Sequence, residues 1–233
     1  MTTSRDQDRG LTKLTAKLFA PMYVDFDRQL SDAFLRRDAF LDRVISQEIP
    51  HLREDLNGKR LSDEANKYIS RSLKGLGGRN TPPLRQVSIA VRHETAEGLR
   101  AVVEEHNLVR DAFLNRLIAL LRASDKLLEA LELPKRISRG RSDGTEDMPT
   151  SPLRAIEETI WDPFHYLRAA CQMRYGHGLH LLEFPVDGFN CYMGDEHVPG
   201  ARAYTDQKEA DEFLLKELED FEAGFVTAKT QGV

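Results

Sequence analysis

The sequence has few of the residues that disulfide frameworks and metal clusters need. It contains two cysteines, Cys171 and Cys191, in 233 residues. Two thiols make neither a disulfide scaffold nor a four-ligand zinc site, so we expect reduced thiols in a cytoplasmic protein. No stretch of 18 apolar residues occurs, and residues 1–10 are polar with mixed charge. We therefore expect neither a membrane-spanning helix nor a secretory signal.

Motifs for catalysis are also missing. The sequence has no phosphate-binding loop, no dinucleotide fingerprint and no nucleophile elbow, so we expect neither an enzyme nor a cofactor. Four potential metal ligands lie close together near the C-terminus: His177, His180, Cys191 and His197. The spacing of His177 and His180 puts them on opposite faces of a strand, although a loop could bring them together. We interpret them as structural residues and predict no metal site.

Charge is distributed unevenly along the chain. Residues 1–140 carry 25 Lys and Arg against 20 Asp and Glu, whereas residues 141–233 carry 8 against 18. The net charge of -5 therefore hides a mildly basic front and an acidic rear. Such an asymmetry is compatible with a nucleic-acid partner at the front, but it does not by itself identify one.

An internal repeat is the most informative feature. Residues 37–45 read RDAFLDRVI, and residues 110–118 read RDAFLNRLI, with seven of nine positions identical at a spacing of 73. The match extends backwards without a gap, so that residues 13–18 align with residues 86–91. Both of these upstream segments alternate polar and apolar residues, which is typical of a strand with one buried face.

Each repeat predicts a short strand followed by two helices. The apolar stripe of residues 21–34 and its counterpart in residues 94–106 predict a first helix of about three turns. Second helices are expected over residues 37–49 and 110–123, with Pro50 ending the first of them. Because a ribbon needs two strands and the chain has two, we expect them to pair within one chain. The small Ala16 should then lie beside Ile89, which keeps the volume of the shared core.

The remaining chain divides into connectors and a rear domain. Residues 60–73 predict another helix, and the Gly- and Pro-containing residues 76–83 a flexible connector. In the rear, a helix is expected over about residues 153–174, strands over 179–184 and 189–193, and an amphipathic helix over about 206–225. The predicted organisation has five parts: module 1 (residues 11–50), a connector with a helix (51–85), module 2 (86–133), a linker (134–152) and an acidic α+β domain (153–228).

The repeated strand–helix–helix pattern resembles the ribbon-helix-helix family of DNA-binding proteins, of the Arc and MetJ type. The resemblance covers residues 13–49 and 86–123 and implies a mainly α fold with a short β-ribbon and two tandem modules. The small α+β C-terminal domain is expected from the pattern of the rear residues and not from the resemblance. It also implies that the outward face of the ribbon enters the major groove of double-stranded DNA. The expected base-contacting residues are Lys13, Thr15 and Lys17 on one strand and Gln86, Ser88 and Ala90 on the other.

The second helices should direct their N-termini at DNA phosphates, because free N–H groups and the helix dipole favour an anion there. Arg36, Arg37 and Arg110 are the expected phosphate contacts. The family usually has a small polar N-cap at this point, whereas this sequence has Arg36 and Val109. In the alternative interpretation, Asp38 and Asp111 cap or charge-complement the helices and the arginines are solvated.

The resemblance thus implies a sequence-specific DNA-binding protein, a transcriptional repressor in the leading hypothesis. Two variants of this hypothesis are an accessory protein for plasmid DNA processing and an antitoxin. The contrasting class is a protein-interaction scaffold that keeps the fold without binding DNA, favoured by the overall acidity and by Ala90. Self-association or a protein partner is expected through the C-terminal domain, and no membrane partner is expected.

Overall fold

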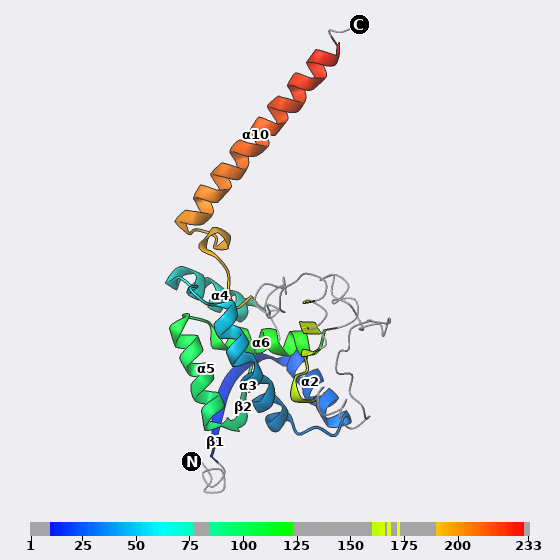
Figure 1. The fold of residues 1–233 in the computed structure, drawn as a ribbon, viewed down its shortest axis with the longest axis vertical. Helices are drawn as coiled ribbons and strands as arrows, with labels where there is room; N and C mark the ends of the chain where they lie inside the picture. The colour runs from blue at the N-terminus through cyan, green and yellow to red at the C-terminus, as the bar shows by residue number, and fades with distance from the viewer. Residues whose placement is uncertain are drawn as a thin grey trace.

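The computed structural model describes residues 10–76, 84–123, 160–165, 167–168, 172 and 190–230, with side chains of the last range described as far as residue 216. This part of the chain is mainly helical, with one two-stranded antiparallel sheet. The order strand–helix–helix occurs twice along the chain, separated by one further helix (Figure 1).

The sheet is a ribbon formed by β1 (Leu11–Phe19) and β2 (Leu84–Arg92), which pair within the chain as the sequence predicts. Alternation has the expected consequence, because every second side chain points to the helices. The buried side chains of the ribbon are Leu14, Ala16, Leu18, Val87, Ile89 and Val91. Ala16 lies opposite Val87, however, and Ile89 lies opposite Leu14. The expected pairing of Ala16 with Ile89 is therefore wrong. Ile89 is the next inward-facing residue of β2 after Val87, the actual partner of Ala16.

Two helices follow each strand. They are α2 (Ala20–Asp32) and α3 (Arg37–Asp55) after β1, and α5 (His93–Glu105) and α6 (Arg110–Leu121) after β2. The helix pairs are joined by turns in which Phe34 has φ 58° and Asn107 has φ 53°. These two residues are 73 positions apart, so the repeat in sequence extends to an uncommon left-handed backbone conformation at the same point of each turn.

Helix α3 continues past Pro50, which corrects the prediction that this residue ends the helix. A proline inside a helix removes one backbone hydrogen bond and crowds the preceding turn. Here Ile49 and Leu52 on either side are buried in the core, at 7% and 1% exposure. Burial of these two side chains favours continuing the helix, while Pro50 itself is on the exposed side.

Helix α4 (Asp63–Gly75) lies in the connector between the two strand–helix–helix units. Its start is well specified, because the Ser62 side chain accepts a hydrogen bond from the Ala65 N–H at 3.0 Å and acidic residues occupy the first turn. The helix predicted for residues 60–73 therefore exists, with a start three residues later.

Two segments from the rear of the sequence pack on the front. Phe164, Cys191 and Val198 are buried in the same hydrophobic cluster as the ribbon and its helices. Arg168 forms an ion pair with the buried Glu48 of α3 and contacts Asp162 at 3.3 Å. The chain thus uses residues from beyond position 160 to complete the core around α3 and α6.

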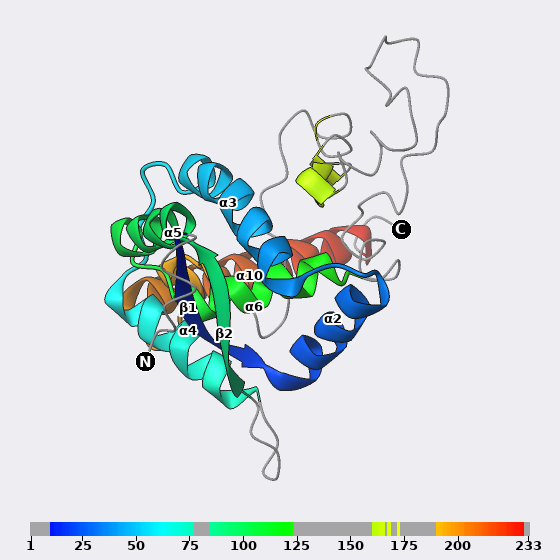
Figure 2. The ribbon, with the colours of Figure 1, turned by 90° about the horizontal axis from the view of Figure 1, so that it is seen from below.

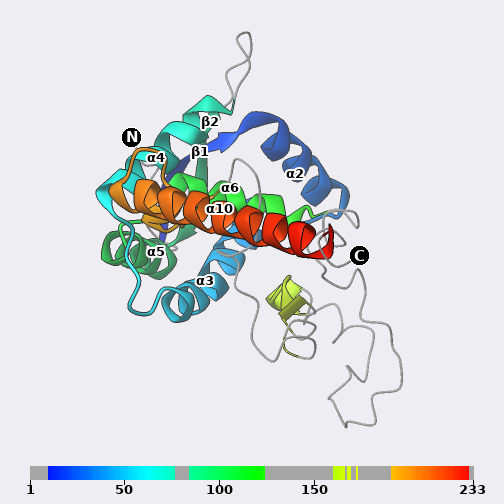
Figure 3. The same cartoon turned by 90° about the horizontal axis from the view of Figure 1, so that it is seen from above.

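The last helix, α10 (Arg202–Thr230), follows a short 3-10 turn, η1 (Asp195–His197), and extends away from the body (Figure 1). The ribbon lies in front of α6 with α10 behind it in Figure 2, and α10 lies in front in the opposite view of Figure 3. Helix α10 therefore leaves the molecule on the side opposite the ribbon. Residues 190–193 are irregular, which corrects the strand expected there.

Several predictions fall outside the described residues: the linker over residues 134–152, the strand over 179–184 and most of the helix over 153–174. The boundaries of the five predicted parts stay a prediction. None of the helices in the described ranges has the length and apolar character needed to cross a membrane.

Candidate nucleic-acid interface

The outward face of the ribbon presents three facing pairs of side chains. Lys13 lies opposite Ala90, Thr15 opposite Ser88, and Lys17 opposite Gln86. All six predicted base-contacting residues are therefore gathered on one face, and all but the half-buried Ala90 are exposed. Lysine, glutamine and hydroxyl side chains are the groups that can hydrogen-bond base edges. The five exposed side chains of these pairs are polar, and none of them is a carboxylate.

The register gives the ribbon an approximate twofold axis. Thr15 faces Ser88, which is its own counterpart 73 residues later. The two strands are therefore related by the same operation that relates the two repeats. A dimeric protein would obtain this arrangement from two identical chains, whereas here the two strands carry different side chains.

The outer edges of the ribbon are held by side chains from the second helices. Asp42 of α3 accepts a hydrogen bond from the Arg92 backbone N–H at 2.9 Å and pairs with the Arg92 side chain at 2.7 Å. At the counterpart position in α6, Asn115 accepts from the Phe19 N–H at 2.7 Å and donates to the Lys17 carbonyl at 2.9 Å. These buried contacts satisfy strand groups that would otherwise have no partner, so they fix the ribbon on the helices.

Two of the predicted phosphate contacts also bind the ribbon. Arg37 donates to the Ser88 carbonyl at 3.2 Å, and Arg110 donates to the Thr15 carbonyl at 2.7 Å. Each also pairs with the carboxylate that follows it, Asp38 or Asp111. Their side chains remain 29% and 41% exposed. A guanidinium has five N–H donors, so both residues combine an anchoring role with donors directed to solvent.

Burial opposes the positive charge of Arg37, but the hydrogen bond to Asp38 and the neighbouring Tyr23 hydroxyl outweigh it, so the pKa of Arg37 is raised. Arg37 also donates a hydrogen bond to that hydroxyl. The residue is therefore a permanent cation beside the start of α3, held by Tyr23 from α2 and by Asp38 from its own helix.

The N-termini of α3 and α6 lack side-chain caps. Arg36 and Val109 occupy the N-cap positions, and neither side chain makes a cap hydrogen bond. Asp38 directs one carboxylate oxygen to the Ala90 N–H of β2 at 3.1 Å. The carboxylates of Asp38 and Asp111 thus contact arginines, and that of Asp38 also contacts the ribbon. Arg36 is exposed next to the start of α3.

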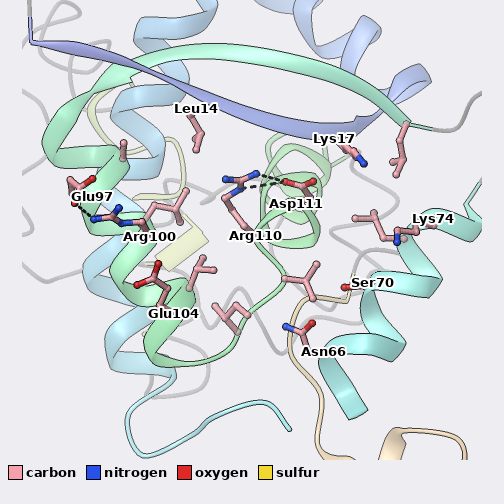
Figure 4. A pocket seen from close by; sticks show the side chains of 17 residues that line it. Leu14, Lys17, Asn66, Ser70, Lys74, Glu97, Arg100, Glu104, Arg110 and Asp111 are labelled. Carbon is pink, nitrogen blue, oxygen red and sulfur yellow. Dashed lines mark hydrogen bonds and ion pairs between the residues drawn. The ribbon is translucent and has the colours of Figure 1, made fainter. Parts of the chain in front are cut away.

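The two sides of the ribbon differ in shape. Beside β1, a groove of about 630 Å³ opens between α4, α5 and the start of α6 (Figure 4). Its wall includes Lys17, Lys74 and Arg110. Beside β2, the place that corresponds to Ala96 of the groove is taken by Tyr23, and the guanidinium carbons of Arg37 and Arg85 each lie 5.9 Å from its ring centre. A small residue leaves the first side open, and a large one fills the second.

The predicted absence of a metal site concerns residues that are only partly described. His177 and His180 lie outside the described residues. Cys191 is fully buried, which raises the pKa of its thiol to about 11 even though the charge of Arg116 opposes this, whereas His197 is exposed. In the described ranges, no three His, Cys, Asp or Glu side chains gather in a way that could hold a metal ion.

The sequence interpretation missed Asp42, Asn115, Tyr23 and Lys74. A signal existed for the first two, because Asp42 and Asn115 are one of the two positions at which the nine-residue repeats differ. The position is polar in both repeats although apolar residues precede it and follow one residue later, which indicates a buried hydrogen bond. Lys74 carried no such signal, because nothing in the sequence places α4 beside the ribbon.

Comparison of the chain with protein-family models, with curated proteins and with solved structures finds no match. The inference of function therefore depends on the geometry of the chain itself.

Proposed function

We propose that this chain is a cytoplasmic, sequence-specific DNA-binding protein of the ribbon-helix-helix type that acts as a transcriptional repressor. The observation that supports this most is the outward face of the ribbon, with Lys13, Thr15 and Lys17 facing Ala90, Ser88 and Gln86. A two-stranded ribbon fits the major groove, where each base pair presents a distinct pattern of donors and acceptors. The chain would work as a binding protein and not as an enzyme.

The contacts of the ribbon support this role. Base recognition needs donors that are held in place before DNA arrives, because ordering them on binding costs free energy. The strand edges are fixed by Asp42, Asn115, Arg37 and Arg110. In the proposed complex, Lys13 and Lys17 donate to guanine O6 and N7, Gln86 forms a bidentate pair with adenine, Thr15 and Ser88 take either role, and Ala90 contacts a thymine methyl.

Phosphate contacts would come from the starts of α3 and α6. Arg36, Arg37 and Arg110 lie there, next to helix N-termini without side-chain caps. Free N–H groups and a positive helix end attract phosphates, and arginine adds charge-assisted hydrogen bonds. Arg37 and Arg110 would hold the ribbon and the DNA backbone at the same time, which couples the register of the protein to that of the duplex.

The proposal is tested by selecting duplexes from a random pool with the purified protein and measuring affinity against salt. We expect a preferred sequence and an affinity that falls steeply with salt. Gln86→Ala should cost about 1–3 kcal/mol on the selected site and relax preference at one position. Gln207→Ala, on α10 opposite the ribbon, is the matched control and should bind as the parent does. Equal binding of all sequences by the parent and by Gln86→Ala would contradict base recognition.

We further propose that α10 mediates association with a second copy or a protein partner. Phe213, Leu214 and Leu215 are 61%, 56% and 61% exposed on this helix. Three large apolar side chains in sequence on a protruding helix are typical of an interaction surface. Replacing Phe213 and Leu214 by Ser should lower the molar mass measured by sedimentation equilibrium if α10 joins copies. A parent that associates through a scaffold surface but never binds DNA would favour the scaffold alternative.

A further inference from the structure

Each strand–helix–helix unit has one turn between its two helices. Helix α4 is fixed on the α5–α6 turn of the second unit. The Asn66 side chain donates to the Asn107 carbonyl at 2.7 Å, and the Leu61 N–H donates to the His106 carbonyl at 3.0 Å. Ala65, Ile69 and Leu73 bury the inner face of the helix. Helix α4 is therefore a fixed part of the α5–α6 end of the molecule.

Within the described part of the chain, no helix covers the opposite end in the same way. Phe34 is the counterpart of Asn107 in the α2–α3 turn, and its side chain is 96% exposed. The connector thus breaks the approximate twofold symmetry of the two units, and it does so on the side where Ala96 leaves the groove open.

Helix α4 carries three positive side chains on one face, and the last of them, Lys74, lines that groove. Lys67, Arg71 and Lys74 follow one another at intervals of four and three residues, which places them on one face of the helix. All three are exposed. The ion pairs found in the described residues include none of them. Lys74 lies at the end of the groove nearest the ribbon, close to Lys17, with Arg110 between them and α5 (Figure 4).

The carboxylates of the groove do not cancel this charge. Glu97 pairs with Arg100 at 2.5 Å, and Asp111 pairs with Arg110 at 3.2 Å. Glu104 lies at the other end of the groove, away from the ribbon (Figure 4). Lys17 and Lys74 therefore leave the end beside β1 with an excess of positive charge.

We propose that α4 is a third DNA-contacting element, which binds two phosphates of the DNA backbone, one through Lys74 and one through Arg71, on the β1 side of the ribbon only. This inference rests on the proposed function and adds to it an asymmetric grip on the duplex. On the β2 side, Tyr23 fills the corresponding space, and no helix equivalent to α4 is found among the described residues. The protein would therefore protect more of the DNA backbone on one side of the ribbon than on the other.

The test compares charge-removing variants on the selected duplex. Each phosphate contact contributes about 0.9 to the slope of log affinity against log salt. We expect Lys74→Ala to lower this slope by about 0.9 and Lys74→Ala with Arg71→Ala by about 1.8, with an affinity loss of roughly five- to tenfold per contact at 0.1 M salt. Lys74→Glu should weaken binding further. Arg53→Ala, an exposed position 16 residues into α3 and about 24 Å from its start, is the matched control.

Hydroxyl-radical footprinting distinguishes loss of the α4 contacts from loss of folding, because an unfolded variant would lose the whole footprint. The parent should protect additional backbone positions on one side of the site centre, and the double variant should lose these positions alone. A double variant with the slope and footprint of the parent would overturn the role of α4 and leave the proposed function intact. A parent that binds no duplex would overturn both.

Discussion

Asp42 and Asn115 occupy counterpart positions and both hold the ribbon on the helices. Replacing each by the residue found at the other position tests the contacts assigned to them. Asn115 is fully buried and makes three hydrogen bonds: it accepts from the Phe19 N–H and donates to the Lys17 and Asp111 carbonyls. Asn115→Asp keeps the acceptor but loses both donors, and it buries a carboxylate beside two carbonyl oxygens. At the counterpart position, Asp42 has the Arg92 side chain as its partner, whereas the residue that corresponds to Arg92 here is Phe19.

The structure therefore predicts unequal costs for the two exchanges. An unsatisfied buried group costs about 1–3 kcal/mol, and an unpaired buried charge costs more. We expect Asn115→Asp to lower the free energy of unfolding by about 3–5 kcal/mol at pH 8, and by less at pH 5, where the carboxyl can take up a proton and donate. Asp42→Asn keeps the acceptor for Arg92 and loses a pair whose arginine is 50% exposed, so about 1 kcal/mol is expected.

Urea unfolding of both variants at the two pH values measures these costs by linear extrapolation. Asn115→Ala separates the hydrogen bonds from the charge, with an expected loss of about 2–4 kcal/mol that does not depend on pH. Equal costs for Asn115→Asp and Asp42→Asn, or an Asn115→Asp variant as stable at pH 8 as the parent, would refute the assigned contacts.

Three further predictions follow from other contacts. Burial raises the pKa of Glu48 to about 7, although Arg168 opposes the shift, so the native state keeps a proton that the unfolded state loses near pH 4.5. The free energy of unfolding should therefore fall as the pH rises from about 4.5 to about 7. Glu48→Gln should remove that part of the fall. Phe164→Ala should cost about 3–5 kcal/mol in urea unfolding, because Phe164 is 2% exposed in the shared core; a variant as stable as the parent would show that the rear segment does not support the front. Cysteines at positions 15 and 88 should form a disulfide within one chain, seen as a linked peptide pair by mass spectrometry, whereas links between chains would contradict the ribbon.

The elements that the sequence predicts best are those in which polar and apolar residues repeat over a few positions. Alternation in residues 13–18 and 86–91 places Leu14 and Ile89 inward correctly, because a strand has no other choice once one face is buried. The repeat of 73 residues links the two units and leads to the pairing of Thr15 with Ser88. Local rules were weaker where packing competes with them. Pro50 shows this, because the burial of Ile49 and Leu52 outweighs its effect on the helix.

Tertiary placement is what the sequence leaves open. Residues 60–73 predict a helix, but its place beside the ribbon comes from long-range contacts, among them the hydrogen bonds of Asn66 and Leu61 to the α5–α6 turn. Arg37 and Arg110 are a similar case. Sequence places them at helix starts, where the resemblance implies phosphates, whereas their contacts with the Ser88 and Thr15 carbonyls need the folded ribbon. A long-range contact of this kind has no periodic signature.

Duplication within one chain has a consequence for the DNA site that the protein would recognise. In a homodimer every substitution appears twice, so both halves of the interface stay alike and the site is palindromic. Here the halves differ where they would meet the duplex: Lys13 corresponds to Gln86, and Lys17 to Ala90. They differ behind the ribbon as well, since Tyr23 corresponds to Ala96. Because lysine favours guanine and glutamine favours adenine, the two half-sites of the selected duplex should have different base preferences, with the centre of the site beneath the Thr15–Ser88 pair.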